Sequence, residues 1–235
     1  MGGCNPSHTP MEPRLKLSKI STTPPVDATE YRGIVGSLRY LVHTRPDISY
    51  SVGYVSRFIE SPTAEHLAVV KRILRYIAGT IDYGCHYKKT GAELKLLGYS
   101  DADMAGDIDT RKSTTGVLFY YGSSLVSWQS QKQKVVALSS CEAEYIAATT
   151  AACQGVWLAQ LLSELRSEQC RPFILKMDSK SAIALNHGVN IGEPADEQYY
   201  EQANEDQFCD PETEGQHFDQ ESPEGFEDGM FNPIL

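Results

Sequence analysis

Apolar residues recur at helical spacing in the first part of the chain. Between Thr29 and His43 they stand three or four positions apart, which predicts a helix with one buried face. Asp27 precedes this run at the N-cap position, and Glu30 follows three residues later at the spacing of a capping box. The run therefore predicts a helix that begins just after Asp27.

Two more helices are predicted after this one. Pro46 ends the first helical run and opens a second helix to about Ile59, because proline is tolerated in a first turn but not in a helix interior. The segment 61–65 starts a third helix, for which Gly79 is the expected C-terminal cap. The basic residues at 71, 72 and 75 are equally consistent with a solvated face and with contact to a phosphate backbone.

After Gly79 the pattern changes from helical spacing to alternation, which predicts strands. A turn at Gly122-Ser123 and another at Thr90-Gly91 predict hairpins. The expected strands are 84–88, 94–99, 116–121, 125–129 and 173–177, with an extended piece at 135–138, a long helix at 141–165 and a short helix at 179–185. This order predicts an α/β or α+β sandwich, in which helices flank the sheet.

Charge divides the chain unevenly. The net charge is −10, but residues 191–235 hold 14 of the 31 acidic residues and none of the 21 Lys and Arg, so the rest carries +4. This acidic tail has little periodicity, which predicts disorder. The expected organisation is an extended segment at 1–26, a helical unit at 27–80, an α/β domain at 81–190 and the tail at 191–235.

The composition also bears on the compartment. No apolar run reaches the roughly 18 residues that cross a bilayer, and the first ten residues lack the basic and apolar parts of a secretory signal. The six cysteines include no C-x-x-C pair, which is typical of free thiols in a reducing compartment. We therefore expect an intracellular protein, cytoplasmic or nuclear, with no membrane partner.

Acidic residues follow two of the predicted strands. Asp101 comes just after the strand at 94–99, and Asp178 just after the strand at 173–177. A third carboxylate comes from the long helix, where Glu142 has the capping-box spacing from Ser139 and Glu144 is free of that role. On spacing alone, surface turns explain the two aspartates slightly better than a shared site does. If the three converge, they form the oxygen ligands that Mg²⁺ prefers.

Several segments, in order, are similar to one family. The sequences KSTTG (112–116), VSWQSQKQ (126–133), ALSSCEAEY (137–145) and MDSKSAI (177–183) resemble the ribonuclease H domain of copia-type retrotransposon polyproteins. Upstream, YRGIVGSLRYL (31–41), TRPDIS (44–49) and LRYIAGT (74–80) resemble the region that follows the polymerase palm in the same polyproteins. The resemblance covers roughly residues 1–187 and implies a ribonuclease H-like fold for 81–190.

The resemblance also implies an activity and a site. The family cleaves the RNA strand of RNA–DNA hybrids with two Mg²⁺ ions, which Mn²⁺ can replace. Its metal-binding and catalytic carboxylates fall on Asp101, Glu144 and Asp178. The residues expected to bind the phosphates of the nucleic acid are Arg111, Lys112, Lys132 and Lys134.

Two departures from the family change the expected activity. No Tyr-x-Asp-Asp sequence occurs, so polymerase activity is not expected. The family's Lys-His-Ile-Asp segment, which carries a fourth metal-site aspartate, has no match in 191–235. The interpretation is therefore a truncated copy whose hydrolytic activity is impaired or lost. The alternative is a non-catalytic protein that binds nucleic acid, or one whose acidic tail binds an unknown protein partner.

Overall fold

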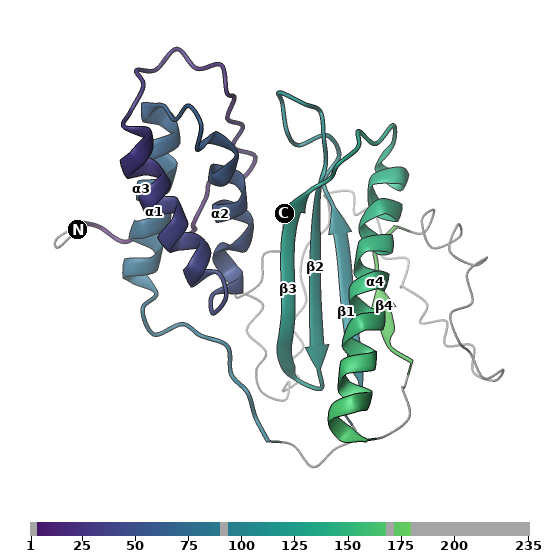
Figure 1. Cartoon of the computed structure of the whole chain (residues 1–235). Helices are drawn as coiled ribbons and strands as arrows, with labels where there is room; N and C mark the ends of the chain where they lie inside the picture. The colour runs from purple at the N-terminus through teal and green to yellow at the C-terminus, as the bar shows by residue number, and fades with distance from the viewer. Residues whose placement is uncertain (1–3, 90–93, 168–171, 180–235) are drawn as a thin grey trace, which may run out of the picture.

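The computed structural model describes residues 4–89, 94–167 and 172–179. A group of helices lies beside a four-stranded sheet, and one long helix packs across the sheet (Figure 1). The predicted turn at Thr90-Gly91, the predicted helix at 179–185 apart from its first residue, and the predicted acidic tail at 191–235 lie outside the described residues. Among the helices described, none has both the length and the apolar composition needed to cross a membrane.

The helical unit contains the three predicted helices, and the second is divided by short 3-10 turns. Its elements are α1 (Ala28–Leu41), η1 (Pro46–Ile48), α2 (Ser49–Val55), η2 (Ser56–Phe58) and α3 (Ala64–Gly79). Their apolar faces form one core that includes the fully buried side chains of Ile48, Val70 and Ile73. Met11 and Leu17, from the segment before α1, are buried in the same core.

The sequence predicts the start of α1 correctly but not the end of α3. The Asp27 carboxylate accepts hydrogen bonds from the backbone N–H groups of Thr29 and Glu30, so the predicted N-cap is confirmed. Gly79 is instead the last helical residue, and Thr80 is the C-cap, so that prediction was wrong. A methyl group at Gly79 would come within 2.6 Å of Pro6, so the close approach of the N-terminal segment explains the glycine.

The sheet has the strand order β3-β2-β1-β4. β1 (Leu96–Ala102), β2 (Thr114–Tyr121) and β3 (Ser124–Lys132) are antiparallel neighbours, and β4 (Ile174–Lys176) pairs in parallel with β1. Gly122, at φ +62°, begins the two-residue turn between β2 and β3, so the predicted hairpin is confirmed. The mixed sheet with flanking helices confirms the predicted α/β class.

Two extended segments predicted from the sequence do not join the sheet. At 84–88 the chain is mostly exposed: Cys85 is half-buried and lines a cavity with residues of α1 and α3, whereas Tyr87 is 62% exposed. At 135–138 the chain has left β3 and buries only Ala137. In each segment one residue is covered and the others are exposed, and neither segment pairs with a described strand.

The long helix α4 (Ser140–Arg166) covers one face of the sheet. Its buried side is a stripe of small residues, which includes Ala147, Ala151 and Gly155 and lets the helix approach the strands closely. A methyl group at Gly155 would overlap the ring of Phe173, which packs edge-on against Phe119 of β2. The helix, β2 and the residue before β4 are therefore packed without spare room at this point.

This packing predicts opposite effects for two glycine substitutions. Gly155→Ala is expected to lower the free energy of unfolding by about 1–3 kcal/mol, because the ring of Phe173 must move. Gly36→Ala, at an exposed helical position with open space around it, is expected to raise it by up to ~1 kcal/mol. Urea denaturation measures both, and a stabilising Gly155→Ala would contradict the close packing.

Candidate functional site

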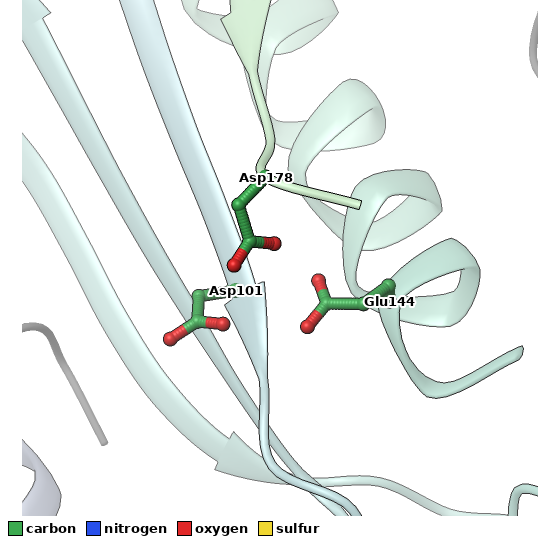
Figure 2. Close-up of side chains that lie close together, drawn as sticks. All are labelled: Asp101, Glu144 and Asp178. Atoms are coloured by element: carbon green, nitrogen blue, oxygen red, sulfur yellow. The ribbon is translucent and has the colours of Figure 1, made fainter. Parts of the chain in front are cut away.

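The three predicted carboxylates lie together at one end of the sheet. Asp101 stands near the end of β1, Glu144 in the second turn of α4 and Asp178 two residues after β4 (Figure 2). One carboxylate oxygen from each can be chosen so that all three atoms lie within 4.8 Å of one another. Glu144 is buried, Asp101 is half-buried and Asp178 is exposed, so the cluster opens toward solvent on one side.

Local hydrogen bonds explain why Glu144, and not Glu142, belongs to this cluster. The N–H of Glu142 donates to the Ser139 hydroxyl over 3.1 Å, and the Glu142 carboxylate accepts from the N–H of Leu138 over 2.7 Å. The second bond goes to the residue before the N-cap rather than to Ser139 itself. Glu142 is thus occupied at the helix start, while Glu144 lies on the side of α4 that faces the sheet.

Glu144 is held on one side and unpartnered on the other. One of its oxygens accepts a hydrogen bond from the N–H of Ala102 over 3.1 Å. The other oxygen is buried and has no partner among the described residues. A buried oxygen without a donor beside two further carboxylates matches the donor set of a hard divalent cation. The residues present therefore fit a metal site.

Burial and mutual repulsion raise the pKa values of these carboxyl groups. Burial raises the pKa of Glu144 to about 7, the charges of Asp101 and Asp178 act in the same direction, and the hydrogen bond from Ala102 opposes them. Burial also raises the pKa of Asp101, with the charge of Asp178 as the next contribution. An arrangement that disfavours its own ionised form is stabilised by a bound cation.

The four predicted phosphate-binding residues stand at the same end of the sheet but differ in their surroundings. Arg111 and Lys134 are exposed. Lys112 donates to the backbone carbonyl of Lys134 over 2.6 Å, which ties the two loops together. Lys132 forms an ion pair with the buried carboxylate of Asp107 at 2.8 Å, so its charge is already matched within the protein. Arg111 and Lys134 are therefore the members of this set most available to a ligand.

Arg72 is one of the basic residues of α3 for which the sequence allowed either a solvated face or contact with a phosphate backbone. Its guanidinium donates to the carbonyl and hydroxyl oxygens of Thr9 and pairs with Glu12 at 2.8 Å. These contacts hold the N-terminal segment against α3. Arg72 is thus occupied within the protein rather than by a phosphate backbone.

Asp107 is an important residue that the sequence analysis did not identify. It joins the helical unit to the sheet, because its carboxylate pairs with Arg57 of η2 as well as with Lys132 of β3. Arg57 also donates to the hydroxyl of Thr114, at the start of β2. The three charged residues lie 25 and 50 positions apart along the chain, so no local pattern could have shown the contact.

The chain is similar in sequence to several known proteins. A retrovirus-related Pol polyprotein from transposon RE1 of Arabidopsis thaliana is 50% identical over 180 residues, which is 77% of this chain and 12% of that protein. The corresponding polyprotein from transposon TNT 1-94 of Nicotiana tabacum is 47% identical over 194 residues, 79% of this chain and 14% of that protein. The chain is thus homologous to a segment of retrotransposon Pol polyproteins. A further relative is the secreted RxLR effector protein 161 of Plasmopara viticola, 47% identical over 54% of this chain and 90% of its own length.

This Pol-related chain corresponds to a small part of the transposon polyproteins. It spans 12–14% of the length of the two described above. No family model matches it. No solved structure matches it either. Homology therefore relates this chain to a region of retroelement Pol polyproteins.

Proposed function

We propose that residues 81–190 form a ribonuclease H-like domain, whose activity is metal-dependent hydrolysis of the RNA strand in RNA–DNA hybrids. The observation that carries this proposal is the convergence of Asp101, Glu144 and Asp178 from two strands and a helix (Figure 2). The mixed sheet with the order β3-β2-β1-β4 and the homology to retrotransposon Pol polyproteins support it.

Within this proposal, each carboxylate has a role set by its surroundings. Asp101 and Asp178 are the more accessible pair and ligate Mg²⁺ or Mn²⁺ on the open side of the cluster. Glu144 is oriented by Ala102 and offers its unpartnered oxygen. Two divalent ions, when bound, supply an activated water and stabilise the leaving oxygen of the phosphodiester.

The substrate in this proposal is a nucleic acid with an A-like shape. Arg111 and Lys134 hold its phosphates near the carboxylates, with an affinity that falls as salt rises. The 2′-hydroxyl groups identify the RNA strand. No membrane or protein partner is needed for this activity.

The test is cleavage of a labelled RNA–DNA duplex in the presence of Mg²⁺ or Mn²⁺. Asp101→Asn is expected to reduce the cleavage rate by at least about 100-fold, because the substitution removes a charged metal ligand. Asp82→Asn, the same substitution at an exposed position after α3, is the matched control and should cleave at the wild-type rate. Equal rates in Asp101→Asn and the wild type would refute the proposal.

A second candidate is a remnant that binds nucleic acid without cutting it. β4 is the edge strand of the described sheet, and residues 191–235 lack the family's segment with the fourth metal-site aspartate. The same assay distinguishes the two candidates. Salt-sensitive hybrid binding with no scission at any metal concentration supports the remnant, whereas turnover that depends on Asp101 excludes it.

A further inference from the structure

Gln133 stands one residue beyond β3, between the sheet and the start of α4. Its side chain is buried, and its amide nitrogen donates to the Ala143 carbonyl over 3.0 Å and to the Thr115 hydroxyl over 3.1 Å. Its own backbone N–H donates to the carbonyl of Ser113 over 2.8 Å. One side chain thus bridges the loop after β3, the strand β2 and the helix α4.

The orientation of this amide is fixed by its partners. The Ala143 carbonyl can only accept, so the nitrogen of Gln133 must face it. The amide oxygen of Gln133 is then buried with no partner among the described residues. A buried acceptor without a donor is unfavourable, and an apolar side chain of similar length would avoid it. What the amide contributes at this position is therefore its pair of donated hydrogen bonds, one to α4 and one to β2.

The bridge ends beside the carboxylate cluster. Ala143 directly precedes Glu144, and Thr115 lies opposite Ala102 in the pairing of β1 with β2. Ala102 in turn donates its N–H to the Glu144 carboxylate. Two adjacent residues of α4 are thus attached to the same pair of strands, one through its carbonyl and one through its side chain.

We propose that Gln133 is a positioning residue, which fixes α4 against the β1–β2 ladder and so sets the place of Glu144 relative to Asp101. This inference rests on the proposed function for its consequence, metal binding, but not for the positioning itself. The cap at Ser139 cannot replace the bridge, because its bonds lie within the helix start and do not reach the sheet.

The experiment uses the full chain and two measurements on Gln133→Met, which keeps the length of the side chain but removes its donors. The first measurement is hydrogen exchange of the Ala102 amide in metal-free buffer, expressed relative to the Phe119 amide so that global unfolding cancels. The ratio of protection factors is expected to fall at least about 10-fold, because the Glu144 carboxylate no longer stays at Ala102. The second is Mn²⁺ affinity by electron paramagnetic resonance, expected to fall about 10-fold.

Gln131→Met is the matched control, because it makes the same substitution at an exposed position of β3 and should change neither measurement. If Gln133→Met does not fold, Gln133→Asn, which keeps the amide but shortens its reach, is measured in the same way. An unchanged Ala102 ratio overturns the inference, as does an unchanged Mn²⁺ affinity in a wild type that binds Mn²⁺. A wild type that binds no Mn²⁺ refutes the proposed metal site, while the amide measurement still decides the role of Gln133.

Discussion

Asp107→Ala is expected to lower the free energy of unfolding by about 3–5 kcal/mol, the usual cost of removing one partner from a buried ion pair. The side chains of Asp107 and Arg57 are only 8% and 12% exposed, and that of Lys132 is 26% exposed. The substitution would leave both cations without their carboxylate. It would also remove two hydrogen bonds that Thr110 donates to Asp107 at 2.8 and 2.7 Å.

Urea denaturation followed by tryptophan fluorescence measures this loss in the free energy of unfolding. Trp128 of β3 donates to the carbonyl of Val42, so its emission reports on the contact between the helical unit and the sheet. Asp82→Ala is the exposed control and should change stability by less than about 0.5 kcal/mol. A loss below about 1 kcal/mol in Asp107→Ala would show that the ion pair does not hold the two parts together.

A double-mutant cycle separates the ion pair from the hydrogen bonds of the loop. Asp107→Asn keeps an acceptor for Thr110 but removes the charge, and Arg57→Met removes the guanidinium. The double variant is expected to lose less stability than the two single variants together, with a coupling of about 1–3 kcal/mol. Strict additivity would mean that Lys132 alone carries the interaction.

Local signals predicted most of the secondary structure, because the forces that shape each element act within a few residues. Asp27 begins α1 by accepting two backbone hydrogen bonds, and Gly122 begins the turn between β2 and β3 at positive φ. The alternation at 84–88 misled the prediction, because most of these residues are exposed and the segment pairs with no described strand. Alternation of apolar and polar residues over five positions does not by itself establish burial or strand pairing.

The candidate site was predictable where capping and strand ends determine it. Glu142 has a capping role at the start of α4, which left Glu144 as the helix carboxylate for the cluster. The contacts of Gln133 and Asp107 were not predictable in this way. Both depend on how α4 and η2 pack against the sheet, which the spacing of residues along the chain does not encode.

In metal-free buffer the protein is expected to lose stability as pH rises, because of the raised pKa of Glu144. Its ordinary pKa is 4.5, and burial raises the folded-state pKa to about 7. A raised pKa means that the folded state binds its proton more tightly than the unfolded state does. The stabilisation is therefore complete below pH 4.5 and is lost as pH rises through about 7. The difference of more than two units corresponds to about 3 kcal/mol by pH 8.

Thermal unfolding of the wild type and Glu144→Gln at pH 5 and pH 8 tests this sign. Because burial lowers the pKa of His66, that group opposes the trend at low pH, so the comparison is made between the two proteins at each pH. Relative to Glu144→Gln, the metal-free wild type should lose on the order of 10 °C in melting temperature between pH 5 and pH 8.

Mg²⁺ should restore the melting temperature of the wild type at pH 8 and have little effect at pH 5, because a protonated Glu144 binds the cation poorly. Glu142→Gln, at the half-buried capping residue, should follow the wild type. If Glu144→Gln and the wild type shift equally with pH, the raised pKa belongs to another group and the three carboxylates do not form a coupled metal site.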